Sequence, residues 1–407
     1  MKRTMRILLM MGLIILTICQ STACAGEGDI VIPEFDDILQ FKVPQNEAMS
    51  FIQDMKIGWN LGNTFDANFD NRYRGDEMDI ESSWCGVKTT EEMIEAIHAA
   101  GFRTLRIPVS WHNHVSDDDF VISTQWLDRV QQVTDWAIAR GMYVILNIHH
   151  DVYPQYMYPS EKHYATAERY VTSIWSQLAE RFARYDHHLI FESMNEPRLK
   201  GTAIEWWFDS SDPDGLESAE CINRLNQAFV NTVRAAGGMN ADRYLMVPGY
   251  CAAPGFAVAS YFRLPQDTAE NRLIISAHAY TPYSFALDMK GTDSFSAYGA
   301  SGRREISNFM NDLYKKYIAN GIPVVIGEFG AMEKKGNLQD RVDFAALYIA
   351  SASARGIPCC WWDNNIFKGN GERFGLFDRK NCAWPYPELV DALMQYAGYD
   401  SIPPRAE

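Results

Sequence analysis

Residues 189–197 read LIFESMNEP and join an apolar run directly to a polar cluster. The run Leu189–Phe191 is short, apolar and partly β-branched, which is typical of a strand buried on both faces. Glu192, Asn195 and Glu196 follow at once. Because burying an unpaired carboxylate is costly, such a cluster is expected where a buried strand ends at a site. The stretch therefore predicts a parallel strand with functional polar side chains at its carboxyl end.

Seven more segments share this pattern, and helix-like segments lie between them. They are KIGWNLGN from Lys56, TLRIPVSW from Thr104, YVILNIHH from Tyr143, YLMVPGY from Tyr244, LIISAHAY from Leu273, PVVIGEFG from Pro323 and PCCWWDNN from Pro358. The intervening TTEEMIEAIHAAG has Thr89 or Thr90 as an N-cap and Gly101 as a stop. TQWLDRVQQVTDWAIARG and SNFMNDLYKKYIANG repeat this arrangement.

Eight strand and helix units without an internal linker predict an α/β fold, a single (β/α)8 TIM barrel over residues 51–398. Residues 26–50 are expected to be an N-terminal spacer and lead-in, and residues 399–407 a C-terminal tail. A doubly wound open sheet is the alternative. It would usually carry a G-x-G-x-x-G loop after its first strand, and GWNLGNTFDA lacks that spacing.

The composition limits the kind of partner. The 407 residues are 47% hydrophobic, with a formal net charge of −15. Nucleic-acid binding needs a basic footprint, so a nucleic-acid partner is excluded and a neutral ligand is favoured. The 11 Trp and 20 Tyr provide flat apolar surface that suits sugar rings.

The N-terminus predicts export. Lys2, Arg3 and Arg6 precede an apolar stretch, residues 7–18, that is too short to span a bilayer as a mature helix. Residues 1–25 are therefore expected to be a signal peptide, cleaved after Ala25 or, in a lipoprotein, before a lipidated Cys24. The remaining cysteines are scattered without a C-x-x-C pair, which indicates no zinc site and permits one or two disulfides.

Polar residues follow seven of the eight predicted strands, at the end where a barrel builds its site. Glu196 and Glu328 follow the fourth and seventh strands, which face each other across a barrel mouth. Two facing carboxylates can perform acid/base or nucleophilic work. In glycoside cleavage a separation of about 5–5.5 Å gives retention and about 6.5–9.5 Å gives inversion.

Arg106 lies among strand residues, where a charge needs a partner. We expect it to hold Glu328 ionised and oriented, to pair with Glu192, or to contact both. For Glu192 itself a structural role is favoured.

His149 and His150 raise the question of a metal. Neighbours on an extended strand point to opposite faces, and no H-x-H or H-E-x-x-H motif accompanies them. We therefore expect no metal site, no cofactor, and imidazoles that bond to hydroxyl groups.

Seven motifs resemble glycoside hydrolase family 5, and most closely its bacterial endo-β-1,4-glucanase and xyloglucanase branch. They are LIFESMNEP, PVVIGEFGA, TLRIPVSW, NIHHD, SAHAYTPYSFA, GWNLGNTFDA and CWWDNNIF with GLFDR. They stand in family order between Met55 and Tyr396. The resemblance implies a retaining, endo-acting (β/α)8 glycosidase that cleaves cellulose-type, mixed-linkage or xyloglucan chains with two glutamates.

The resemblance also implies roles for individual residues. Glu196, with a raised pKa, would be the general acid/base, and Glu328 the nucleophile. Asn195 would bind the sugar 2-hydroxyl, and Trp362, rather than Trp361, would lie under the sugar at the cleavage point. Further residues expected at the substrate are Asn63, Arg106, His149, His150, His278 and Tyr280.

Three alternatives remain open at this stage. An endo-β-1,4-mannanase or xylanase would share the scaffold, a surface lipoprotein would bind glycan without cleaving it, and a metal-dependent barrel hydrolase would need an ion. The expected partner is a β-glucan polysaccharide or oligosaccharide. The expected state is a monomer, secreted or held at the surface of a bacterium as a lipoprotein.

Overall fold

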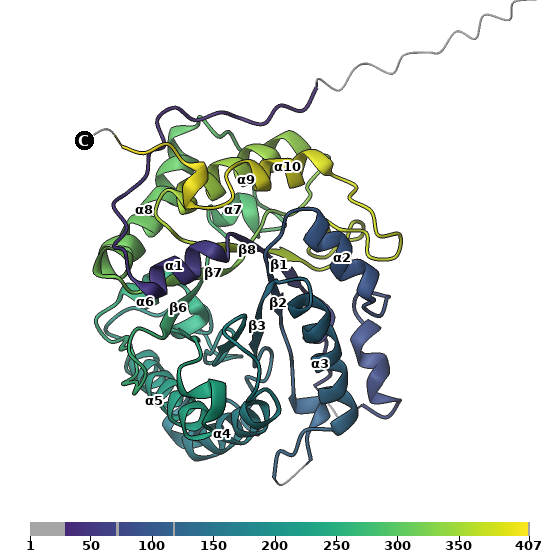
Figure 1. Cartoon of the computed structure of the whole chain (residues 1–407), viewed down its shortest axis with the longest axis vertical. Helices are drawn as coiled ribbons and strands as arrows, with labels where there is room; N and C mark the ends of the chain where they lie inside the picture. The colour runs from purple at the N-terminus through teal and green to yellow at the C-terminus, as the bar shows by residue number, and fades with distance from the viewer. Residues whose placement is uncertain (1–28, 71–72, 117–118, 406–407) are drawn as a thin grey trace, which may run out of the picture.

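Eight parallel strands close into a barrel in chain order, which confirms the predicted (β/α)8 fold (Figure 1). A computed structural model describes residues 29–70, 73–116 and 119–405. The strands are β1 (Ile57–Leu61), β2 (Thr104–Ile107), β3 (Tyr143–Asn147), β4 (Leu189–Glu192), β5 (Leu245–Pro248), β6 (Leu273–His278), β7 (Val324–Phe329) and β8 (Cys359–Asp363). Each lies within one of the eight segments predicted from the sequence.

Helices follow the strands and surround the barrel (Figure 1). The α-helices are α1 (Glu47–Asp54), α2 (Glu91–Ala99), α3 (Thr124–Ile138), α4 (Tyr164–Arg181), α5 (Pro213–Ala235), α6 (Pro254–Val258), α7 (Tyr283–Ala286), α8 (Ala300–Lys316), α9 (Leu338–Ser353) and α10 (Pro387–Gln395). The 3-10 helices are η1 (Glu77–Ser82), η2 (His112–His114), η3 (Glu161–His163), η4 (Gly238–Ala241), η5 (Tyr250–Ala252), η6 (Ile318–Asn320) and η7 (Tyr399–Ser401).

Local sequence signals explain where these elements begin and bend. Thr90 is the N-cap of α2, and its side chain accepts the N–H of Met93, so Thr90 rather than Thr89 caps this helix. The β6/β7 ladder is regular until Ala277 and shifts its register at His278, which pairs with Glu328. Such an irregularity at a barrel rim redirects side chains, here at two residues expected in the site.

Helix α1 covers the amino-terminal end of the barrel. Its Phe51 stacks on Tyr244 with ring centroids 3.7 Å apart and meets the edge of Tyr143 at 5.2 Å. Tyr143 begins β3 and Tyr244 directly precedes β5, so both lie at the end opposite the strands' carboxyl termini. The carboxyl end is thus the open face of the barrel.

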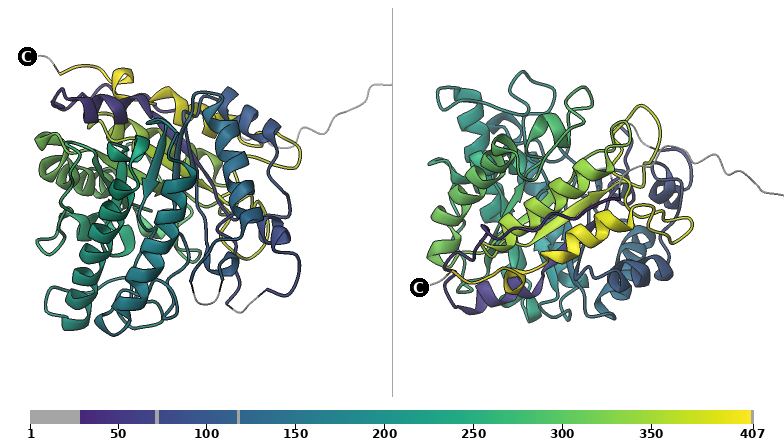
Figure 2. Two further views of the ribbon diagram at one scale, coloured as in Figure 1. Left: turned by 60° about the horizontal axis from the view of Figure 1, so that its bottom comes forward. Right: turned by 90° about the horizontal axis from the view of Figure 1, so that it is seen from above.

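The chain ahead of α1 lies on the helical layer. Residues 29–46 run beside α9 and α10 (Figure 2). Val31 exchanges backbone hydrogen bonds with the Gln339 side chain, and the Tyr396 hydroxyl donates to the carbonyl of Pro33. Buried Phe35 packs on Tyr396 with centroids 5.5 Å apart.

Several sequence expectations concern residues beyond this description. The signal peptide and Cys24 lie outside the described residues, and the proposed domain boundaries stay a prediction.

The six cysteines that the structure describes, Cys85, Cys221, Cys251, Cys359, Cys360 and Cys382, are all free thiols. Within the described ranges, no helix has both the length and the apolar character needed to cross a bilayer.

Candidate active site

Glu196 and Glu328 converge at the open end of the barrel. Glu196 follows β4, and Glu328 lies near the end of β7. One oxygen of each carboxylate and a ring nitrogen of His278 all lie within 4.8 Å of one another. Glu196 is partly exposed, whereas Glu328 and His278 are buried. The structure therefore brings the two predicted glutamates to one place.

Arg106 is the centre of the hydrogen-bond network beneath them. Its Nε donates to Glu192 Oε2 at 2.9 Å, and Nη1 donates to Asn60 Oδ1 at 2.9 Å and to Glu328 Oε1 at 2.7 Å. Its Nη2 donates to Asn195 Oδ1 at 2.7 Å and lies 2.7 Å from Glu192 Oε2. All five guanidinium N–H groups thus have partners, and Arg106 contacts both carboxylates that the sequence suggested.

These contacts fix the direction of neighbouring side chains. Because the Asn195 oxygen accepts from Arg106, its NH₂ group is not engaged by Arg106 and remains a hydrogen-bond donor. The Tyr280 hydroxyl donates to Glu328 Oε2 at 2.9 Å, so each oxygen of Glu328 accepts a hydrogen bond. Burial and the charge of Glu328 raise the pKa of Tyr280 well above its usual value, which keeps this hydroxyl protonated.

Glu192 has the structural role favoured from the sequence. It is fully buried and also accepts from Ser276 Oγ at 2.5 Å and Asn147 Nδ2 at 3.0 Å. Burial alone would raise the pKa of Glu192, but Arg106 and His278 outweigh burial and lower that pKa to about 2. Glu192 therefore stays ionised and balances the charge of Arg106.

The expected raised pKa of Glu196 is wrong for the free protein. Burial does raise the pKa of this carboxyl, but the hydrogen bond and charge of His278, together with Arg198 and His150, lower it overall. His278 Nδ1 lies 2.9 Å from Glu196 Oε1. Although burial opposes its charge, Glu328, Glu192 and Glu196 raise the pKa of His278 to about 9. Both shifts favour a charged His278 beside an ionised Glu196 in the free protein.

The expectation that His149 and His150 point to opposite faces is also wrong. Strand β3 ends at Asn147, so strict alternation does not reach these residues. Their rings meet edge to face, with centroids 4.3 Å apart. Burial lowers the pKa of both, that of His150 to about 4, so both are neutral imidazoles.

Two groups of described residues have the donor atoms that a metal ion would need. In one, atoms of Asp66, His149 and His150 lie within 4.8 Å of one another. Asp66 accepts the backbone N–H groups of Asn63 and Thr64, which accounts for its orientation within the loop. The other group is formed by Glu196, His278 and Glu328, which already bond within the network described above.

The two tryptophans of β8 have different surroundings. Trp361 packs in the core against Phe329, whereas Trp362 lies parallel to His149, with centroids 5.9 Å apart and an interplanar angle of 3°. Trp362 is therefore the tryptophan placed at the mouth, as expected. Asn63 is the second residue after β1 and has a left-handed conformation with φ 56°.

Sequence reasoning missed five residues around the site. Asn147 and Ser276 hold Glu192, and Asp66 lies beside the histidine pair. Arg198 donates to the Glu196 carbonyl at 2.9 Å, and its position two residues after NE was an available signal. Partial desolvation, with the negative charges of Glu196 and Glu328, raises the pKa of Glu372, which lies on the exposed loop after β8, and no local pattern indicates this placement.

Comparison with known proteins decides the family. The model of cellulase (glycosyl hydrolase family 5) matches residues 67–368. The chain belongs to glycosyl hydrolase family 5. The resemblance inferred from the seven motifs is thereby confirmed.

Two relatives of this family 5 chain are endoglucanases of Ruminococcus albus. It is 46% identical to endoglucanase B of Ruminococcus albus over 87% of this chain and 81% of the relative. Endoglucanase 1 of Ruminococcus albus is 44% identical over 87% of this chain and 82% of the relative. The predicted enzyme class, a glycosidase of the endoglucanase type, is confirmed.

Solved structures agree with this family 5 assignment. A family 5 lichenase from Caldicellulosiruptor sp. F32 is 56% identical, with a TM-score of 0.88, over 90% of this chain and 99% of that one. A xyloglucan-specific endo-β-1,4-glucanase from a metagenomic library, in complex with cellotriose, is 36% identical, with a TM-score of 0.77, over 86% of this chain and 99% of that one.

The raised pKa of His278 predicts how the stability of the folded protein depends on pH. The pKa of His278 is about 9 in the folded protein and 6.5 when unperturbed. Protonated His278 therefore contributes its full amount to the free energy of unfolding below pH 6.5, and this contribution is lost as the pH rises through 9. The loss is about 3 kcal/mol at most. Urea unfolding of wild type and His278→Gln across this range should show a steeper decline for wild type. Equal slopes, or an imidazole NMR titration of His278 near pH 6.5, would contradict the assignment.

Proposed function

We propose that this family 5 enzyme is a retaining endo-β-1,4-glucanase in which Glu328 is the nucleophile and Glu196 the general acid/base. The observation that carries the proposal is the approach of the two carboxylates, with oxygens within 4.8 Å of each other. A separation of about 5–5.5 Å leaves no room for a water between nucleophile and sugar, and so favours a covalent intermediate. Glu328 is also the carboxylate held by Arg106 and Tyr280.

The reaction takes two steps. Glu328 attacks the anomeric carbon while a proton from Glu196 passes to the departing glycosidic oxygen, so one C–O bond forms as another breaks. Glu196, now ionised, then takes a proton from water, and the resulting hydroxide displaces Glu328 from the anomeric carbon. The two inversions return the original β configuration.

His278 is the source of the proton that Glu196 donates to the leaving oxygen. In the free protein Glu196 is ionised, and protonated His278 lies 2.9 Å away as a donor. Substrate binding displaces water from Glu196 and thereby favours its neutral form. Proton transfer from His278 to Glu196 across this contact then gives the neutral carboxylic acid that protonates the leaving oxygen.

The other site residues bind the sugars. Asn195 directs its NH₂ group to the 2-hydroxyl at the cleavage point, and neutral His149 and His150 bond to neighbouring hydroxyls. Trp362 provides a flat surface beneath the ring. Asn63 donates its backbone N–H to Asp66, whose carboxylate lies beside His149 and His150.

We assign β-1,4-linked glucans, with or without mixed linkages or side chains, as the substrate. The relatives named above are endoglucanases, a lichenase and a xyloglucan-specific glucanase, and the same lichenase has been solved as a mutant in complex with cellotetraose. We further propose that the enzyme is exported, anchored through Cys24 if the lipoprotein signal is used, and monomeric. The signal-like residues 1–25 support export.

Replacing the proposed nucleophile should abolish turnover. Glu328→Gln keeps the size of the side chain and removes the nucleophilic charge, and its NH₂ group can donate to the Tyr280 hydroxyl, which is able to accept. We therefore expect kcat to fall by about 10⁴-fold or more on barley β-glucan, with the circular dichroism spectrum unchanged. Glu196→Gln, the matched variant, should lose about 10²–10⁴-fold. Substantial activity in Glu328→Gln would remove Glu328 from this role.

The stereochemistry of the first product tests the double displacement. Proton NMR during early hydrolysis of a cello-oligosaccharide should show the β-anomer before mutarotation produces the α-anomer. An initial α-product would establish a single displacement and overturn the retaining mechanism.

A polysaccharide panel tests the substrate class. Reducing ends should appear fastest with barley β-glucan, carboxymethylcellulose or xyloglucan, and at least about tenfold more slowly with glucomannan and xylan. Activity should survive a strong chelator. Preference for glucomannan or xylan would favour the mannanase or xylanase alternative, and binding without hydrolysis would favour the glycan-binding one.

A further inference from the structure

Arg198 lies two residues after the proposed acid/base, on the loop that follows β4. Its side chain is buried beside the open end of the barrel. Its Nη1 donates to the backbone carbonyl of Glu196 at 2.9 Å and also lies 3.7 Å from Glu196 Oε2. One guanidinium group therefore holds the backbone of Glu196 and faces its carboxylate.

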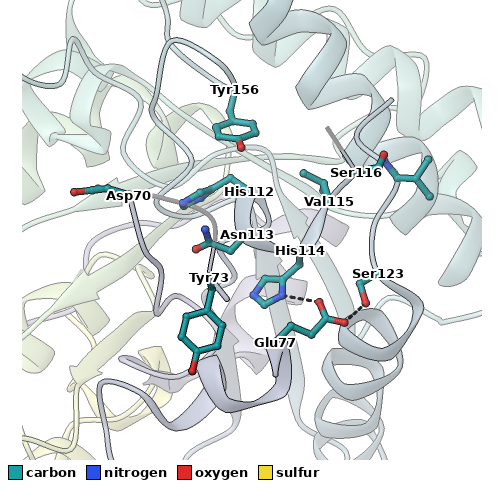
Figure 3. Close-up of a pocket in the computed structure, with 11 residues that line it drawn as sticks. Asp70, Tyr73, Glu77, His112, Asn113, His114, Val115, Ser116, Ser123 and Tyr156 are labelled. Atoms are coloured by element: carbon teal, nitrogen blue, oxygen red, sulfur yellow. Dashed lines mark hydrogen bonds and ion pairs between the residues drawn. The ribbon is translucent and has the colours of Figure 1, made fainter. Parts of the chain in front are cut away.

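The contact with the carboxylate leaves one oxygen of Glu196 available. Its Oε1 lies 2.9 Å from His278 Nδ1, whereas Arg198 is beyond hydrogen-bond distance of Oε2. Glu77 shows the opposite arrangement, in the wall of a cavity lined by the loops after β1, β2 and β3 (Figure 3). Both oxygens of Glu77 bond to neighbouring side chains. Glu196 is thus oriented by its neighbours and still has an oxygen that can meet a glycosidic oxygen.

The rest of the guanidinium group is fixed by two residues of the same loop. The Nε of Arg198 donates to Glu205 Oε1 at 3.2 Å. The guanidinium carbon lies 4.0 Å from the ring centroid of Trp206, which attracts the cation and covers one side of it. The Trp206 ring is itself exposed. Arg198 is therefore held by a carbonyl, a carboxylate and an aromatic ring at once.

The loop after β4 is in turn anchored to η5. Cys251 donates its backbone N–H to the carbonyl of Pro197 at 3.0 Å, and its thiol lies 3.2 Å from the carbonyl of Glu205. Cys251 has a φ of 54°, a left-handed conformation that is uncommon for residues with a side chain and is found often at functional sites. The chain is thus fixed on both sides of Arg198.

Arg198 is one of several charged or titratable groups around Glu196. The others are His278 on β6, Tyr280 after it, Glu328 on β7, His150 after β3, Cys251 in η5 and Glu372 after β8. Burial raises the pKa of the Glu196 carboxyl, whereas His278 and, after it, Arg198 and His150 lower that pKa. Removing the charge of Arg198 should therefore raise the pKa of Glu196.

We propose that Arg198 is a positioning residue for Glu196, which holds the free carboxylate oxygen where the leaving glycosidic oxygen is protonated. Arg198 acts through Glu196 and does not itself touch the reacting atoms. The inference rests on the proposed glucanase function, because that function makes Glu196 the acid. The effect of Arg198 is therefore confined to substrates whose leaving group must be protonated.

The test compares a leaving group that needs a proton with one that does not. We measure kcat/KM on cellotetraose and on dinitrophenyl β-cellobioside, whose leaving group departs as a stable phenolate. For both substrates kcat/KM reports the step that forms the glycosyl-enzyme. The variants are Arg198→Met, which removes the charge, Arg198→Lys, which keeps it, and Glu196→Gln, which removes the acid.

Arg129→Met is the matched control. Arg129, on α3, also bonds to a carboxylate, that of buried Glu81, and to a backbone carbonyl, that of Thr89. Its guanidinium carbon lies 5.3 Å from the ring centroid of Trp136. Arg129→Met thus loses the same kinds of contact in the helical layer. It should lower stability and leave both kcat/KM values and their pH dependence unchanged.

A positioning role predicts a selective loss. Arg198→Met should lose about tenfold or more in kcat/KM on cellotetraose and stay within about threefold of wild type on dinitrophenyl β-cellobioside. Glu196→Gln should show the same selectivity with a larger loss on cellotetraose. Arg198→Lys should recover only part of the loss, because an ammonium group keeps the charge but lacks the planar fork that reaches Glu196, Glu205 and Trp206 together.

The pH profile gives a readout that a purely structural role would not move. The basic limb of kcat/KM on cellotetraose reports loss of the proton that the acid needs. Because Arg198→Met removes a positive charge beside Glu196, this limb should move to higher pH by about half a unit or more. Arg198→Lys should leave the limb near its wild-type position.

The outcomes separate this inference from the proposed function. Equal losses of Arg198→Met on the two substrates, or a basic limb at the wild-type pH, would overturn the positioning role. If Arg198→Met does not fold, Arg198→Lys carries the same comparison of substrates, and an equal loss on both again overturns it. Absence of the leaving-group selectivity in Glu196→Gln would instead remove Glu196 from the acid role, and the proposed mechanism would fail whatever Arg198 does.

Discussion

A single buried guanidinium orders the open end of this barrel. Arg106 is inaccessible to solvent, and its cost of burial is offset because every one of its N–H groups has a partner. Those partners come from β1, β4, β7 and the loop after β4, so one side chain ties together walls that are far apart in the chain. The orientation of Asn195 and of Glu328 follows from which of their atoms Arg106 uses.

The charges around Arg106 divide into a fixed layer and a titrating layer. The deeper layer, Arg106 with Glu192, stays ionised because each stabilises the charge of the other in the buried interior. Nearer the mouth, His278 contacts Glu196 at 2.9 Å, and a proton can pass between them. A proton can therefore move between His278 and Glu196 while Arg106 and Glu192 beneath them stay ionised and keep their positions.

Much of this structure could be predicted from the sequence because barrel strands carry a local signal. Each strand is a short apolar run, and the glutamates follow two of those runs, so their meeting follows from the order of strands alone. The relation of His149 to His150 could not be predicted, since it depends on β3 ending at Asn147 rather than three residues later. The pKa of Glu196 also escaped prediction, because it depends on the distance to His278, which only folding sets.

The described cysteines have a consequence for the conditions under which the fold can form. All six are thiols, and five of them are buried, including Cys359 and Cys360 in the wall of the barrel. Burial raises the pKa of both barrel thiols, which keeps them protonated and unreactive. The described structure is therefore held by packing and hydrogen bonds without covalent cross-links, and added reductant should leave it unharmed.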